Sequence, residues 1–207
     1  MDSFTRCCRN ASTRTSIRWA ARQCLSGMRA LIVAVVLYFT VSSVALAASV
    51  SVGNAAIAPS NQGYFLDADF NLRLNGTLED ALGRGVVLYF VIEGRLWRPR
   101  WWWFNDLVTA AQLTRTLSYN SLTRQYRLSN GREYQNFSAL EDAETALGQV
   151  RDWKIADAQS LDKTNRYRGS IRMWLDVTQL PKPFQVKAVT AKDWSMDSDD
   201  FVFDVNL

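Results

Sequence analysis

The stretch VVLYFVIEGRLW, residues 86–97, has a side-chain pattern with a period of two. Its even positions, from Val86 to Leu96, are all apolar or glycine, whereas its odd positions include Glu93 and Arg95. Successive side chains of a β-strand point to opposite faces of the sheet. The stretch therefore predicts a strand whose even positions face a hydrophobic core.

The same alternation cannot continue past Trp97. Extending it would turn Arg98 and Arg100 into the core without partners, at a cost of several kcal/mol each. Pro99 lies between them, and a proline cannot donate a hydrogen bond within a central strand. We therefore predict a bulge or turn at Arg98 to Arg100.

The residues after this break are rich in tryptophan. In an extended chain Trp101 and Trp103 share one side, and Trp102 and Phe104 share the other. Either one pair covers the core while the other lies under a neighbouring loop, or the segment is an exposed aromatic surface. Such a surface, with basic neighbours, stacks on a sugar ring, a peptide or a lipid headgroup. The predicted binding surface consists of Arg98, Arg100, Trp101, Trp102, Trp103 and Phe104.

Further strands and turns are expected on both sides of this segment. The expected strands are residues 49–57, 64–74, 113–119, 124–128, 133–137, 167–177 and 201–205, and PFQVKAV after Pro183. The pair Asn130-Gly131 predicts a type I′ hairpin turn. Two short helices are expected at residues 77–83 and 138–148, and Ser138 and Glu141 fit a capping box in the second.

Many short strands with closely spaced turns are typical of a mainly β domain. We expect an antiparallel β-sandwich, immunoglobulin-like, with two short helices. A small closed barrel is the alternative. The expected domain covers residues 48–207.

The N-terminal residues have the pattern of a secretory signal peptide, which adds a signal-peptide helix before the domain. Arginines precede an uncharged apolar run at residues 30–48, which ends in small residues. We expect a signal peptide at residues 1–47, cleaved after Ala47 or Ala48, with Met28 as an alternative start of translation. This places the domain in the periplasm. The alternative is an anchor in the inner membrane through residues 30–48.

Composition excludes several classes of function. Residues 1–47 carry six arginines and one aspartate, a net +5, so the remainder carries −1 against +4 for the whole chain. A nearly neutral domain is not built to bind nucleic acid. The chain has no histidine, and its three cysteines lie in the first 47 residues. Histidine triads, thiol nucleophiles and zinc sites with histidine or cysteine ligands are therefore excluded from the domain.

Carboxylates remain as possible reagents. A pair of carboxylates can hydrolyse a glycoside, and Asp67, Asp69 and Glu93 are the residues considered for that role. We expect all three to lie on an ordinary solvated face. The acidic residues between Asp193 and Asp200 lack the glycine and distal glutamate of an EF-hand loop. No catalytic, cofactor-binding or metal-binding residue is therefore predicted, and no cofactor.

An ordered set of short motifs runs through the chain after residue 48. These motifs are residues 85–88, 101–102, 117–119, 126–128, 138–143, 180–184 and 194–196. Together they resemble a proteobacterial family of secreted domains of unknown function, numbered 4390. Phe201 and Phe203 stand where the family pattern has further tryptophans. The resemblance implies an envelope protein of Gram-negative bacteria and brings no activity or site residues.

These observations favour an exported, non-catalytic binding module rather than an enzyme. The expected partner is an envelope protein, a glycan or a membrane surface, and not nucleic acid. One alternative is a small outer-membrane β-barrel, because the chain ends in an alternating strand. The other is a glycan-acting enzyme that depends on carboxylates.

Overall fold

A computed structural model of the chain describes residues 49–100, 105–162 and 164–205. These residues all belong to one compact unit, Leu46–Leu207. The predicted signal peptide lies outside the described residues. In the part that is described, no helix is long and apolar enough to cross a membrane.

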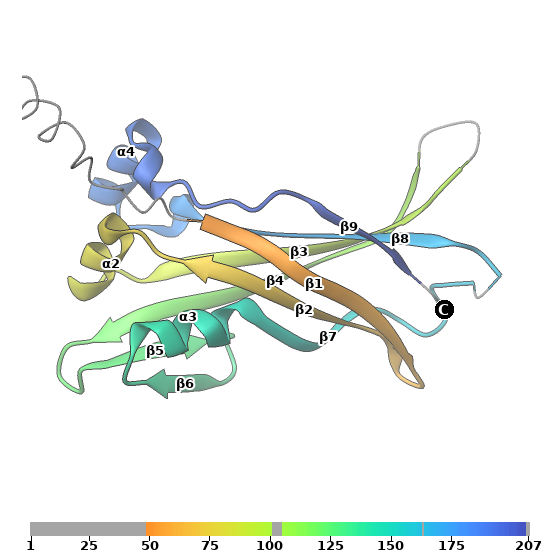
Figure 1. Cartoon of the computed structure of the whole chain (residues 1–207), viewed down its shortest axis with the longest axis horizontal. Helices are drawn as coiled ribbons and strands as arrows, with labels where there is room; N and C mark the ends of the chain where they lie inside the picture. Colours follow the sequence, from red (N-terminus) through yellow and green to blue (C-terminus); the bar gives the residue numbers. More distant parts are fainter. Residues whose placement is uncertain (1–48, 101–104, 163, 206–207) are drawn as a thin grey trace, which may run out of the picture. The chain divides into compact units, whose positions relative to one another are not determined.

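The prediction of a mainly β fold with antiparallel sheets is confirmed (Figure 1). The strands are β1 (Ser49–Ser60), β2 (Gly63–Arg73), β3 (Leu88–Arg98), β4 (Asp106–Asn120), β5 (Gln125–Ser129), β6 (Tyr134–Phe137), β7 (Gln149–Ala156), β8 (Tyr167–Leu175) and β9 (Phe201–Val205). The helices are α2 (Gly76–Gly83), α3 (Leu140–Gly148) and α4 (Lys182–Thr190), with 3₁₀ turns at Val177–Gln179 and Lys192–Trp194.

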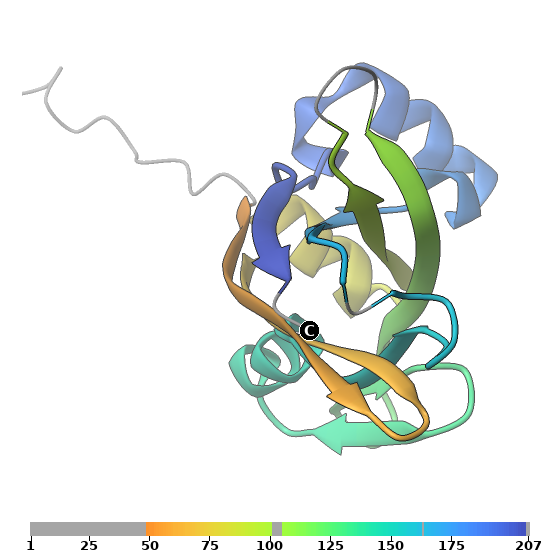
Figure 2. The same cartoon turned by 90° about the vertical axis from the view of Figure 1, so that its right-hand side faces the viewer.

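The strands form two open sheets. The first has the order β1-β2-β7 and the second has the order β6-β5-β4-β3-β8-β9. Every neighbouring pair is antiparallel. Figure 2 shows the second sheet curving around the core, with β1 and β2 on the opposite side. A constant-type immunoglobulin domain divides its strands four and three, so the immunoglobulin-like expectation is met only as far as two antiparallel sheets around one core.

The core is formed largely by apolar side chains at alternate positions of the strands. In β3, Leu88, Phe90, Ile92 and Leu96 are fully buried, as their period of two predicts. Alternate residues of β2 and β8 join them in a single cluster that draws on both sheets. The strand β3 ends at Arg98, within the predicted Arg98 to Arg100, whereas the register shift in its pairing with β4 lies earlier than predicted, between Leu96 and Trp97.

Both predicted helices are present, with Asn75 and Ala139 as their N-cap residues. Asn75 caps α2, since its side chain accepts a hydrogen bond from the backbone N–H of Leu78 at 2.9 Å. The N-cap of α3 is Ala139, and no side chain caps that helix. The capping box predicted for α3 is therefore wrong.

The third helix, α4, replaces a predicted strand. Its N-cap is Pro181 and a proline occupies its first turn, where the missing N–H would have no partner within the helix. The carbonyl of Pro181 accepts hydrogen bonds from the N–H groups of Phe184 and Gln185. The ring of Phe184 packs against Trp194, with centroids 5.5 Å apart. The two prolines thus start a helix instead of a strand.

The hairpin between β5 and β6 is confirmed, but its predicted type I′ turn is wrong. That turn requires positive φ at both central residues, whereas only Gly131 of the pair has one, at 90°. A four-residue loop joins the strands, and the side chain of Asn130 accepts hydrogen bonds from the N–H groups of Arg132 and Glu133. The asparagine thus organises the loop through its side chain.

Candidate functional site

The odd-numbered residues of β3 lie on the face of the six-stranded sheet that is turned away from the core. We call this the outer sheet face. It is formed by Tyr89, Val91, Glu93, Arg95 and Trp97 of β3, by the residues paired with them on β4 and β8, and by Val202 and Asp204 of β9. Because the four strands are neighbours in one sheet, these side chains form rows across it.

Glu93 is the centre of the outer sheet face. Its neighbours in the row are Gln112 of β4 and Arg172 of β8. Oε2 of Glu93 accepts from Nε of Arg172 at 2.9 Å and lies 2.5 Å from Nη2 of Arg95. Oε1 accepts from Nε2 of Gln112 at 3.2 Å. The carboxylate is thus held from three sides and is buried.

These contacts decide the protonation of Glu93. Burial raises the pKa of its carboxyl, but hydrogen bonds from Gln112 and Arg172 and the charges of Arg95 and Arg172 outweigh burial. The pKa of Glu93 therefore lies below its usual value. The guanidinium of Arg172 also lies 4.6 Å from the ring centroid of Trp174, which is cation–π geometry. The network therefore fixes both an arginine and a tryptophan on this face.

The outer sheet face has a pocket toward each end. One, of about 470 Å³, is lined by residues that include Arg95, Trp97 and Val202. The other, of about 450 Å³, is lined by residues that include Trp174 and Trp194. In Figure 1, α4 lies near one end of β8, and β3 and β4 rise toward the viewer's upper right at the other end.

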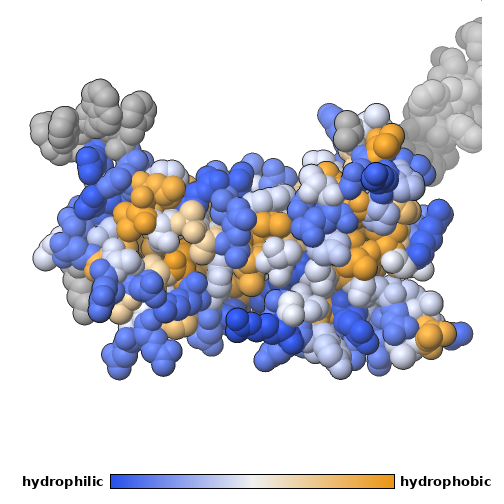
Figure 3. All heavy atoms as spheres, turned by 180° about the vertical axis from the view of Figure 1, so that it is seen from behind, coloured by the Kyte–Doolittle hydropathy of each residue, from blue (hydrophilic) through white to orange (hydrophobic). Residues whose placement is uncertain are grey.

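Apolar side chains reach solvent beside the first pocket. Leu107, paired with Trp97, is 47% exposed, and Val202 is 58% exposed. Figure 3 shows hydrophobic residues in a band bordered by hydrophilic residues on the side of the molecule opposite to Figure 1. Exposed apolar groups around half-buried tryptophan and arginine are the composition of a binding surface rather than of a purely solvated face.

The structure places only two residues of the predicted binding surface. Nη2 of Arg98 donates to Oδ2 of Asp106 at 2.5 Å, and Nη2 of Arg100 donates to the same oxygen at 3.2 Å. The hydrogen bond from Arg98 holds the pKa of Asp106 below its usual value, against a smaller opposing effect of desolvation. Both arginines are thus paired at the end of the β3–β4 hairpin. The remaining four residues, Trp101, Trp102, Trp103 and Phe104, lie outside the described residues.

The three carboxylates considered for catalysis do not share one surface of one sheet. Asp67 and Asp69 lie on β2 in the three-stranded sheet, and Glu93 lies on β3 in the other. Asp67 accepts from the backbone N–H of Asp152 at 2.8 Å, and Asp69 pairs with Arg151. The expectation of a solvated face is wrong for Glu93, because its side chain is buried and its charge is stabilised by ion pairs with Arg95 and Arg172.

Sequence reasoning missed Arg172 and Trp174 as members of a site. Arg172 and Trp174 occupy the alternate positions of β8 that face away from the core, as Glu93 and Arg95 do in β3. The sequence therefore shows that these residues lie on the outer side of their strands. What the sequence does not display is the pairing of β3 with β8, which brings Glu93 opposite Arg172 across 79 positions of chain.

Comparisons with known proteins give one match. The family described as "Domain of unknown function (DUF4390)" matches residues 47–204. No curated protein and no solved structure matches the chain.

Proposed function

Since the chain belongs to the family of the domain of unknown function DUF4390, we propose its function from the geometry: an exported, non-catalytic module that binds a partner protein of the cell envelope through the outer sheet face. The observation that carries the proposal is that half-buried arginine and tryptophan side chains line both pockets of this face, Arg95 and Trp97 in one and Arg172 and Trp174 in the other. Tryptophan and arginine are enriched among the residues that dominate binding energy at protein interfaces.

The order already present on this face supports binding. Glu93 holds Arg95 and Arg172 in place, and Arg172 lies over Trp174. Side chains fixed before a partner arrives lose little conformational entropy when it binds. Each pocket, of about 450 to 470 Å³, has room for an aromatic or aliphatic anchor of a partner protein.

The charge balance of the face favours a protein over a polyanion. Three arginines (Arg95, Arg168 and Arg172) stand against two carboxylates, and Arg168 lies 3.4 Å from Asp204. Binding to nucleic acid or to an anionic membrane draws on many unpaired cations. A nearly neutral face with exposed Leu107 instead suits the apolar centre of a protein interface.

A double variant tests the proposal. Leu107→Ser with Val202→Ser removes two exposed apolar side chains of the face, and Leu122→Ser is the matched control, because Leu122 is 93% exposed in the β4–β5 turn. We expect the tagged chain to recover an envelope protein that, once purified, binds the purified chain. The double variant should weaken this binding at least about tenfold and the control should not.

Three results would contradict a protein partner at this face. Equal binding by the double variant and the control would remove the face from the interaction. The purified chain could instead sediment with vesicles of phosphatidylethanolamine and phosphatidylglycerol, and the double variant could abolish this sedimentation. That result would identify the partner as a membrane and not a protein. Sedimentation of the chain with peptidoglycan, if the double variant abolished it, would identify the partner as a glycan.

Export is part of the proposal. The basic residues, the apolar run and the small residues up to Ala48 support a cleaved signal peptide, and the family match starts at residue 47. We expect the protein in the periplasmic fraction, with a mature N-terminus at Ala48 or Ser49. N-terminal sequencing of that fraction tests this. Recovery of an intact chain in the inner membrane would support the anchor through residues 30–48 instead.

A further inference from the structure

A second site lies on the inner side of the six-stranded sheet, away from the outer sheet face. Arg115 of β4 pairs with Phe90 of β3, whose side chain is fully buried. Its neighbours on the same parity are Leu113 and Leu117, which pair with Ile92 and Leu88. Arginine is rarely turned inward unless it has a partner, so the position of Arg115 implies that other groups bind its guanidinium.

Those partners are backbone carbonyl groups. Nη1 of Arg115 donates to the oxygens of Ala146 at 3.0 Å, Leu147 at 3.1 Å and Gln149 at 2.7 Å, at the end of α3. A cation is favourable there, because the C-terminus of a helix carries partial negative charge. The guanidinium is therefore held in a fixed orientation by a single nitrogen.

The rest of the guanidinium has no counter-charge. No carboxylate among the described residues forms an ion pair with Arg115, and no described hydrogen bond uses its Nη2. Its Nε is buried without a partner in the described structure. Burial, and to a smaller extent the charge of Arg151, lower the pKa of Arg115. An anion beside Nη2 would favour the charged guanidinium and would therefore oppose both effects.

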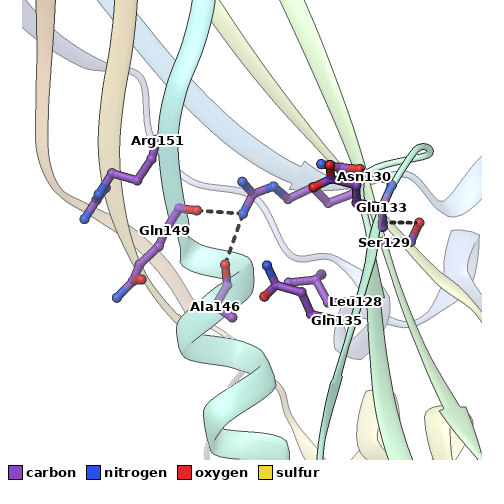
Figure 4. Close-up of a pocket in the computed structure, with 9 residues that line it drawn as sticks. Leu128, Ser129, Asn130, Glu133, Gln135, Ala146, Gln149 and Arg151 are labelled. Carbon is purple, nitrogen blue, oxygen red and sulfur yellow. Dashed lines mark hydrogen bonds between the residues drawn. The ribbon is translucent and has the colours of Figure 1, made fainter.

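Arg115 lines a pocket of about 270 Å³. Figure 4 shows Ala146 and Gln149 on one side of this pocket and Leu128, Gln135 and Asn130 on the other. Carboxamides both donate and accept hydrogen bonds, so the walls suit a ligand with hydroxyl or amide groups. Leu128 and Ala146 add apolar surface for its carbon skeleton.

The charges around the pocket limit the charge of the ligand. Arg151 also lines it but is paired with Asp69, and the acidic residue Glu133 is a further lining residue. Arg115 is therefore the one lining cation without an acidic partner in the described structure. We infer that this pocket binds a small polar monocarboxylate, such as a sugar acid or an N-acylated amino acid, with the carboxylate on Nη2 of Arg115. The planar guanidinium suits a carboxylate geometrically.

Titration of the purified chain followed by ¹H–¹⁵N NMR tests this inference. The probes are glucuronate, N-acetylalaninate, inorganic phosphate and uncharged glucose, at constant ionic strength. We expect saturable shifts of backbone amides in residues 129–135 and 146–151 with one or both carboxylates, and none with glucose. The carboxylate that binds more tightly tells a sugar acid from an amino-acid derivative. Absence of saturable shifts with both carboxylates would overturn the inference, as would tighter binding of phosphate.

Four variants locate the site. Arg115→Gln should abolish binding, and retained binding in a folded Arg115→Gln chain would overturn the inference. Because that variant also loses the bonds to α3, two exposed positions provide independent tests. Gln135→Ala should weaken binding roughly three- to tenfold through a lost hydrogen bond, and Glu133→Gln should strengthen it about two- to threefold by removing a nearby negative charge. Gln159→Ala, an exposed glutamine outside the pocket, is the control. Equal affinity in Gln135→Ala, Glu133→Gln and the control would overturn the inference.

Discussion

Replacing Glu93 by glutamine removes the negative charge that Arg95 and Arg172 share. The glutamine keeps the shape of the side chain and can still contact Gln112, so the main change is electrostatic. Both arginines then lie together on the outer sheet face without a counter-charge. In the wild-type chain, Oε2 of Glu93 lies 2.5 Å from Nη2 of Arg95 and 2.9 Å from Nη2 of Arg172. We expect the folded state to be destabilised.

The exposure of the three side chains sets the magnitude. Glu93 is 9% exposed, while Arg95 and Arg172 are 29% and 34% exposed. Exposed ion pairs contribute about 0–1 kcal/mol, and breaking a fully buried pair costs about 3–5 kcal/mol. The network lies between these limits. Glu93→Gln should therefore lower the free energy of unfolding by about 1.5–3 kcal/mol.

Urea unfolding followed by circular dichroism measures this change, and its pH dependence identifies the cause. The pKa of Glu93 in the folded state lies below its usual value. Its contribution to stability is therefore fully present above the unfolded-state pKa of about 4.3, and it is lost as the pH falls through the folded-state pKa. The difference between wild type and Glu93→Gln should stay constant near neutral pH and shrink below about pH 4.

A matched glutamate controls for the substitution itself. Glu141 is 81% exposed and lies 3.7 Å from Arg73, so Glu141→Gln should change the free energy of unfolding by less than about 0.5 kcal/mol. Equal effects of Glu93→Gln and Glu141→Gln would refute the reasoning. A difference that persisted unchanged to about pH 3 would refute the electrostatic cause.

Two further predictions concern the helices, and urea unfolding measures both. A Cβ on Gly148 at the end of α3 would lie 2.3 Å from the backbone oxygen of Phe70, whereas one on Gly83 at the end of α2 would meet no heavy atom within 4 Å. Gly148→Ala should therefore cost about 2–3 kcal/mol and Gly83→Ala should be neutral or stabilising by about 0.5 kcal/mol; equal effects would contradict the close approach of α3 to β2. Asn75→Ala removes the cap on the N–H of Leu78 and should cost about 0.5–2 kcal/mol, so an unchanged urea midpoint would contradict the cap.

Most strands were predictable from local sequence, and the alternation was clearest where one face is buried, as in β2, β3 and β8. The alternation in residues 86–97 identified the core residues of β3, and two arginines around Pro99 located its end. The segment PFQVKAV failed because its apolar residues fit a strand or a helix equally well, and the choice rests on packing of Phe184 against Trp194. β7 was missed because its polar residues mask the alternation and its pairing with β2 shifts twice.

The sites were less predictable because they depend on pairing over long distances. Glu93 and Arg172 look like ordinary polar residues until β3 and β8 are placed side by side. Arg115 did carry a local signal, since it stands between Leu113 and Leu117 on the parity that faces the core. Its contacts with the end of α3 nevertheless depend on tertiary structure.

Photo-crosslinking in living cells tests the role of the outer sheet face most directly. A photoreactive amino acid at position 202 would lie on that face beside Trp97 and Arg95, and one at position 122 would lie in the β4–β5 turn. We predict one discrete protein adduct from position 202, lost when Trp97→Ala is added, and no such adduct from position 122. The same adduct from both positions, or none from position 202, would contradict the account.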